Sequence, residues 1–292
     1  MGFESITIEK KTPQVMEKKT ISAYEGNPSL VMFKRFSDPV IREQMINLFL
    51  QIEEEKAKQK DIEIVYDDYG NPILDEQGRP KIKKTPSSYV PKSRKSIELR
   101  TEMQINKVKS ETPITFSPDV TSFASMEDLG RETIALCSGM EPGKKPTLKQ
   151  QEIIESHEKG HAVRKYTGPF LERYFAKGFD PRAIDYTAED FEKKKILAEA
   201  LKLDTTGVTY DMAKESLTEY LFSGPEIAER MSQLKNYFGF AGNEQFTKEH
   251  LHYAKENYIK DTQMDNDMKH FFQAITPETE DAFIELINNS GI

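Results

Sequence analysis

The amino-acid sequence predicts a mostly α protein with a small β element, preceded by an extended N-terminal region of mixed α and β character. Beyond about residue 130, apolar residues recur at the spacing of amphipathic helices. The first candidate helix there begins after a capping box and ends at glycine and proline. Segments that favour strands gather before that point. The chain is therefore expected to divide into an accessory region, 1–129, and a helical domain, 130–292.

The accessory region is expected to hold short strands and one helix. ITI (6–8) and LVMF (30–33) are short strand candidates. A helix should begin at Asp38 as N-cap, because Pro39 suits the first helical position and apolar residues follow at helical spacing. Residues 62–84 predict short strands separated by Tyr-Gly-Asn-Pro and Gln-Gly-Arg-Pro turns.

A basic segment, 79–109, ends this region. It carries ten Lys or Arg and two Glu, a net charge of +8. Because the whole chain has a net charge of −8, the rest of the chain carries −16. The segment could dock on an acidic surface of this protein or of a protein partner, or it could be a solvated linker. Tyr89 is its only aromatic residue, and the chain as a whole is acidic, so no nucleic-acid partner is expected.

Composition narrows the setting of the protein. No stretch approaches the roughly 18 apolar residues of a membrane span, and the N-terminus lacks the pattern of a signal peptide. The one cysteine, Cys137, excludes an internal disulfide framework and a cysteine-based zinc cluster. The sequence therefore favours a protein of the cytoplasm, or one carried within a larger assembly, without a membrane partner.

The helical domain should begin with a well-capped helix. Thr147 and Gln150 form a capping box directly after Pro146, and the helix should run over 148–166 before Thr-Gly-Pro ends it. Further helices are expected at about 169–177, 187–203, 210–222, 225–238, 247–259, 265–274 and 277–288.

The first of these helices carries the residues with the clearest chemistry. His157 and His161 are four residues apart, so on a helix both can offer a nitrogen to one metal ion. Glu158 lies beside the first histidine, where it could handle the proton of a metal-bound water. Ile154 shares the histidine stripe, which should therefore face inward. Gly160 is small enough to let another element approach the helix closely.

This HExxH arrangement resembles the active-site helix of the zincin superfamily of metallopeptidases, over residues 148–166. The resemblance implies a zinc ion, a peptide or protein substrate, and a strand beside the site that offers its edge to the substrate. ITFSPDVTSF, 114–123, is the strongest candidate for that strand. Metzincins carry glycine and histidine where this chain has Arg164 and Thr167, so the resemblance is to gluzincins, which take a glutamate from a later helix.

The segment 223–238 supplies the candidate third ligand. Its apolar stripe leaves Glu226 at about 110° from the stripe centre and Glu229 at about 170°, which predicts that Glu229 faces solvent. Glu226 is therefore the predicted ligand, with Arg230 as a partner that orients it. The alternative is that Glu226 only stabilises the first turn of its helix and pairs with Arg230.

Other residues remain candidates for supporting roles. His252 and Tyr237 are possible oxyanion donors or outer-shell partners, and His250, His252 and His270 are alternative third ligands. His250 and His252 are two residues apart and so lie on different helix faces.

The resulting functional hypothesis is a zinc-dependent metallopeptidase. Zinc held by His157, His161 and Glu226 would bind a water, and Glu158 would act as general base. The alternative is a structural or assembly protein, for example a component of a virion or large complex, in which the site is a relic. The N-terminal arm favours this alternative, because extended segments wrap partners well.

Overall fold

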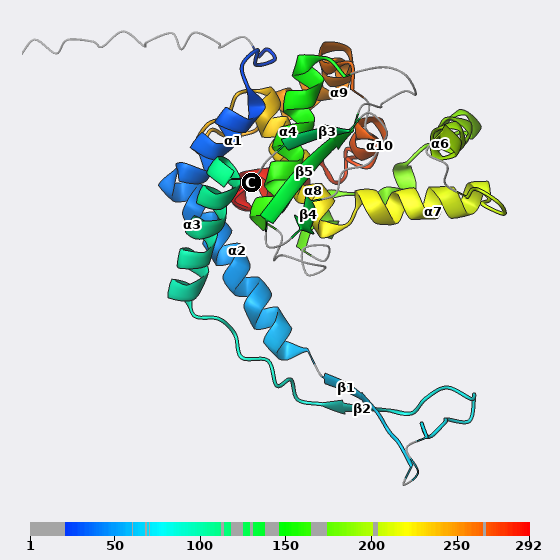
Figure 1. The fold of residues 1–292 in the computed structure, drawn as a ribbon. Helices are drawn as coiled ribbons and strands as arrows, with labels where there is room; N and C mark the ends of the chain where they lie inside the picture. The colour runs from blue at the N-terminus through cyan, green and yellow to red at the C-terminus, as the bar shows by residue number, and fades with distance from the viewer. Residues whose placement is uncertain are drawn as a thin grey trace, which may run out of the picture.

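The computed structural model describes residues 21–59, 61–67, 69, 71–111, 114–117, 125–128, 131–137, 146–164, 174–200, 204–264 and 267–292. The protein is mostly α, as the sequence predicts, with a small β element (Figure 1). Within these ranges, no helix has both the length and the apolar character needed to cross a membrane.

Up to residue 164, the helices of the described residues are α1 (Pro28–Ser37), α2 (Pro39–Lys58), α3 (Arg94–Glu111) and α4 (Leu148–Arg164). The residues after 164 hold 3₁₀ turns η1 (Ala176–Gly178) and η2 (Pro181–Ala183), then α6 (Ala188–Ala200), α7 (Tyr210–Leu221), α8 (Gly224–Tyr237), α9 (Lys248–Thr262), α10 (Met268–Gln273) and α11 (Glu280–Asn289). The strands are β1 (Asp61–Ile64), β2 (Ile82–Thr85), β3 (Ile114–Ser117), β4 (Ser125–Asp128) and β5 (Arg131–Cys137). The expected strand 6–8 and most of the expected helix 169–177 lie outside the described residues.

The two N-terminal helices follow from their caps. The Asp38 carboxylate accepts hydrogen bonds from two backbone amides in the first turn of α2, as predicted. The strand expected at 30–33 is wrong, because these residues belong to α1. Asn27 caps that helix, and Pro28 occupies its start. The cap signal therefore outweighs the strand preference of Val31 and Phe33, which are buried instead on a helix face.

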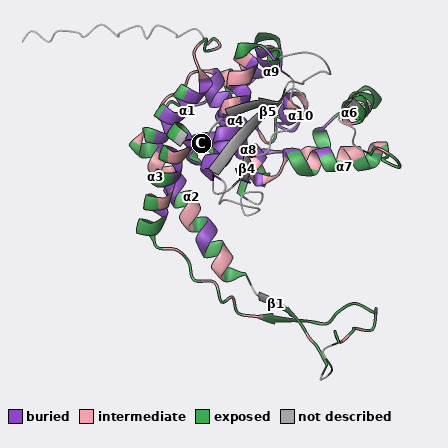
Figure 2. Ribbon diagram, in the orientation of Figure 1, coloured by how far each residue is buried: buried purple, intermediate pink, exposed green. Residues whose placement is uncertain are grey.

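The segment between α2 and α3 forms an arm that projects from the body (Figure 1). β1 pairs with β2 antiparallel. Between these strands, isolated β-bridges join Tyr66 to Pro72 and Leu74 to Pro80, and each bridge closes a turn. These are the predicted turns. Asp67 and Asp75 hold them by accepting backbone hydrogen bonds from residues two and four positions further on. The arm is mostly exposed (Figure 2).

A second sheet contains three strands in the order β3–β5–β4. β3 runs parallel to β5, whereas β4 pairs with β5 antiparallel and forms an edge. The strand expected at 114–123 is present over 114–117, and the rest of that range lies outside the described residues. The expectation that the chain becomes helical from residue 130 is wrong over 131–137, which form β5.

The basic segment 79–109 is only partly a linker. Residues from Arg94 onward form α3, which buries Ile97, Ile105 and Val108. α3 contacts α2 and α4, and the Gln104 side chain donates a 2.8 Å hydrogen bond to the carbonyl of Ala162. The solvated-linker interpretation is therefore wrong for this part of the segment.

Helices on both sides of residue 130 share one body. α1 contacts α4 and α8, and Leu48 and Ile52 of α2 belong to the same apolar cluster as residues of α8, α9 and α11. The proposed division into 1–129 and 130–292 stays a prediction about independent folding. α4 and α8 lie side by side in this body, and they carry the candidate site.

Candidate metal centre

The local sequence determines where α4 begins. The Thr147 amide donates to Gln150 Oε1 at 2.8 Å, and the Gln150 amide donates to Thr147 Oγ1 at 3.3 Å, which is the predicted capping box. His157 and His161 follow on the buried stripe with Ile154. Their side chains are 11% and 20% exposed, so the inward orientation predicted for the pair is confirmed.

α8 presents the third member of the site. Ser223 and Pro225 begin the helix, and Glu226 lies in its first turn. Residues of α8 meet α4 in reverse order, since Glu226 reaches His161 and Asn236 reaches Ser156. The two helices therefore run antiparallel, and the start of α8 lies beside the end of α4.

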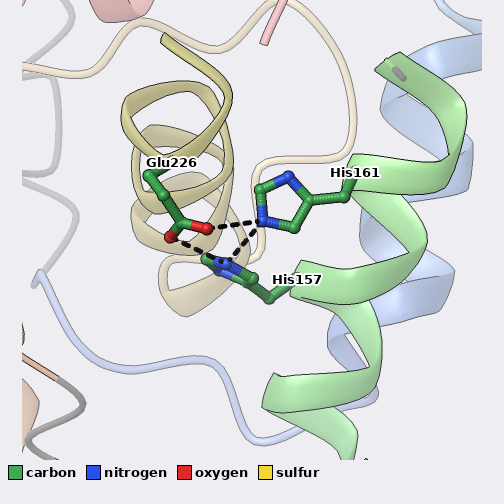
Figure 3. Close-up of side chains that lie close together, drawn as sticks. All are labelled: His157, His161 and Glu226. Carbon is green, nitrogen blue, oxygen red and sulfur yellow. Dashed lines mark hydrogen bonds and ion pairs between the residues drawn. The ribbon is translucent and has the colours of Figure 1, made fainter. Parts of the chain in front are cut away.

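His157, His161 and Glu226 form a group that could hold a metal ion (Figure 3). One ligand atom from each lies within 4.8 Å of the others. His161 Nε2 lies 3.0 Å from His157 Nε2 and 3.0 Å from Glu226 Oε1, and His157 Nε2 lies 3.4 Å from Glu226 Oε2. Ligands at zinc distances in a tetrahedron are separated by about 3.3 Å. The two nitrogens and one oxygen are therefore close enough to bind one metal ion together.

The charges of the group reinforce this fit. Burial alone would raise the pKa of Glu226, but hydrogen bonding with both histidines holds it far below its usual range. Burial alone would lower the pKa of His161, yet Glu226 and the nearby charge of Glu229 raise it above its ordinary value. The carboxylate is thus anionic at neutral pH, and it faces both histidines with a negative charge that a bound cation would offset.

Glu158 lies next to the group but outside it. Its side chain is buried, and desolvation raises the pKa of its carboxyl, against the opposing effect of the charges of His157 and His161. A raised carboxyl pKa suits a group that accepts a proton near neutral pH.

Arg230 lies one turn beyond Glu226, as expected for a partner that orients it. Its Nη2 is 3.5 Å from Glu226 Oε2, and the guanidinium is buried. Oε2 thus lies within ion-pair distance of both His157 and Arg230, at 3.4 and 3.5 Å. The placement fits both the orienting role and the simpler ion pair that the sequence left open.

Two neighbours of the site were missed at the sequence level. The first is Gln233. When the proton of His157 is on Nδ1, this nitrogen donates to Gln233 Oε1 at 3.2 Å, and Nε2 is left for a metal ion. Gln233 Nε2 in turn donates to the Tyr258 hydroxyl. Gln233 lies seven residues after Glu226, two helical turns along α8, which is the signal that could have found it.

The second is Tyr220, at the end of α7. The residue is 49% exposed, and its pKa responds to the charges of Glu226 and Arg230. Burial of the hydroxyl and the charge of Glu226 raise the Tyr220 pKa well above its ordinary value. The Arg230 guanidinium lies 6.0 Å from the ring centroid. Tyr220 therefore lies near Arg230, the ion-pair partner of Glu226.

The prediction that Glu229 faces solvent is wrong. This side chain is 0% exposed and pairs with Arg164 of α4. Every residue of α8 except Pro225 is buried, because α4 covers the polar face of the helix. The apolar stripe identified one buried face and gave no information about the second.

The remaining candidates lie elsewhere. The Tyr237 hydroxyl donates to Asp261 at 2.5 Å, and the exposed His252 pairs with Glu280 at 3.0 Å. His250 closes the cap of α9 against Thr247, and His270 is buried beside Asp190. The structure brings none of these four side chains into the group formed by His157, His161 and Glu226.

No protein-family model matches this chain, and comparisons with curated proteins and with solved structures find no match either.

Proposed function

We propose that the protein is a zinc-dependent metallopeptidase that hydrolyses peptide bonds. One observation carries the proposal: three metal-ligating side chains from two helices meet within 4.8 Å, directly beside a buried glutamate. Two imidazoles and one carboxylate are a ligand set of catalytic zinc sites, which keep a further position for water or substrate. Zinc in this position would supply positive charge that acidifies a water and polarises a carbonyl.

The residues around the group have complementary roles in this proposal. Glu158 accepts a proton from the attacking water and delivers it to the leaving nitrogen, a role that its raised pKa supports. Arg230 orients Glu226, and Gln233 fixes the tautomer of His157. Tyr220 donates a hydrogen bond to the oxygen that gains charge during attack.

The substrate would be an extended peptide. β4 forms an edge of the three-stranded sheet, and α4 contacts both β4 and β5. A peptide that added to this edge would extend a sheet that packs against α4, the helix that carries His157 and His161. The mixed sheet beside α4 thus supports a peptide substrate over a small metabolite.

An assembly role is the second candidate, and the projecting arm between α2 and α3 favours it. Tyr66, Tyr69 and Leu74 on this arm are more than half exposed. Exposed aromatic and aliphatic side chains on an extended arm are typical of a surface that a protein partner covers. In this reading the arm binds the partner, and the metal group only stabilises the fold.

Two substitutions separate the ligand from the base. Glu158→Gln should keep zinc but lower the peptide hydrolysis rate at least about a hundredfold, because it removes the proton acceptor. Glu226→Gln should lower zinc occupancy, because it removes the anionic ligand. Both are measured as zinc content and as cleavage rate on an unstructured protein substrate.

Glu256→Gln is the matched control, since Glu256 is exposed on α9. It should change neither zinc content nor rate. A wild-type protein that binds zinc but cleaves no unstructured substrate would exclude the peptidase and leave the assembly role. If Glu158→Gln retained the full rate, the assignment of the base would be wrong.

A further inference from the structure

Gly160 of α4 lies directly against the side chain of Glu229 of α8. A Cβ atom at this position would overlap the carboxylate of Glu229. Gly160 directly precedes His161, and Glu229 lies almost one turn beyond Glu226. This contact between the two helices is therefore close to a candidate ligand on each of them.

The Glu229 carboxylate has little freedom to move away from this contact. Its side chain is 0% exposed, and its Oε1 accepts a hydrogen bond from Arg164 Nη1. Arg164 is itself 4% exposed, and its guanidinium lies 4.9 Å from the centroid of the Phe36 ring. The Glu229 carboxylate is thus held between Gly160 and the buried guanidinium of Arg164.

We infer that Glu229 and Gly160 are positioning residues for the metal group. The carboxylate of Glu229 sits in the notch left by Gly160, and Arg164 holds it there. This contact fixes how closely α8 approaches α4, and so fixes the distance between Glu226 and the two histidines. The inference rests on the proposed metal binding, but it makes its own statement about the geometry of the ligand atoms.

The charge of the pair favours a role beyond packing. A buried ion pair is weak evidence for stability, because desolvation of both ions offsets their attraction. An apolar contact between the helices would serve stability as well. A carboxylate pinned at one oxygen instead specifies one register of the two helices, as buried polar contacts do in helical assemblies.

The test uses a pair of substitutions that act in opposite directions. Gly160→Ala fills the notch, pushes α8 away, and should lower zinc affinity by about 10- to 100-fold, the range that loss of outer-shell partners produces. Glu229→Asp withdraws the carboxylate by roughly 1.5 Å, one carbon–carbon bond. In the double variant the shorter side chain makes room for the methyl group, so zinc affinity should recover at least about tenfold from Gly160→Ala.

Leu251→Ala is the control for loss of stability, because Leu251 is buried on α9 outside the metal group. It should lower the melting temperature and leave the zinc dissociation constant unchanged. The inference is overturned if Gly160→Ala binds zinc like wild type, if the double variant does not recover, or if Leu251→Ala loses as much affinity.

Crystal structures of the metal-free variants give a readout that does not depend on zinc. In Gly160→Ala, the ligand atoms of His157, His161 and Glu226 should no longer lie within 4.8 Å of one another, and in the double variant they should return. If wild type binds no zinc, the proposed function fails, and these structures still decide the inference. Unchanged ligand positions in Gly160→Ala would overturn it.

Discussion

Glu226 and Glu229 lie on the same helix, yet their carboxylates meet different partners. Glu226 faces the histidines of α4, whereas Glu229 faces Gly160 and Arg164. The angle of Glu226 to the apolar stripe led correctly to its place in the group. The same reasoning failed for Glu229, because it assumed that the face opposite an apolar stripe is solvated.

His161 gives a pH dependence with opposite signs in the two metal states. In the metal-free protein its pKa is raised above the unfolded value, mainly by Glu226 acting against burial. The stability that this proton contributes is complete below the unfolded pKa, about 6.5, and is lost as pH rises through the folded value. Zinc needs an unprotonated imidazole, so its stabilising effect should grow over the same interval.

The measurement is the melting temperature of chelator-treated and zinc-loaded protein from about pH 6 to about pH 9. The chelator-treated protein should lose stability with rising pH, and His161→Gln should reduce that loss. The raised pKa of Glu158 gives a loss of the same sign, so Glu158→Gln should reduce the loss without removing it, whereas His161→Gln removes the part due to the histidine. Parallel pH profiles with and without zinc would contradict the assignment of His161.

At the scale of elements, the sequence of α3 has apolar residues at helical spacing, although its composition is strongly basic. Ile97, Thr101, Gln104, Ile105 and Val108 are buried at helical spacing. The ten basic residues of 79–109 nevertheless led to the interpretation as a solvated linker. Long cationic side chains on the outer face of a packed helix are compatible with a buried inner face, so net charge is a poor guide to packing.

Ile105→Ala tests whether α3 is part of the body. It removes a side chain that is 3% exposed in a cluster with residues of α1, α2 and α4, so the free energy of unfolding should fall by about 2–5 kcal/mol. Met103→Ala is the control, because Met103 is 63% exposed on the same helix and should change the value by less than about 0.5 kcal/mol. Urea denaturation measures both. Equal small effects would show that α3 is the solvated link that its charge suggested.

For the whole molecule, the predictable parts are those with local causes. Caps at Asp38 and Thr147 fixed the starts of α2 and α4, and helical periodicity identified the inward histidine pair. β5 and the place of Tyr220 beside Glu226 were not predicted. Pairing among β3, β5 and β4, and packing between α7 and α8, bring together residues whose separation in sequence carries no periodic signal.

The arm between α2 and α3 differs in solvent exposure from the body that holds the site. The arm is extended and mostly exposed, whereas α4 and α8 lie within a packed body (Figure 2). The group formed by His157, His161 and Glu226 belongs to the body, since these side chains come from α4 and α8. Metal binding is therefore expected to be a property of the folded body, whatever the arm contacts.

The most direct test of the account is the metal content of the purified protein. Elemental analysis should find about one zinc per chain, and the single variants His157→Ala, His161→Ala and Glu226→Gln should each bind less. Added zinc should raise the melting temperature of chelator-treated wild type, because a ligand that binds only the native state stabilises it by about 2.7 kcal/mol at a hundred times its dissociation constant. A wild-type protein that contains no transition metal, and whose melting temperature zinc does not raise, would contradict the central claim.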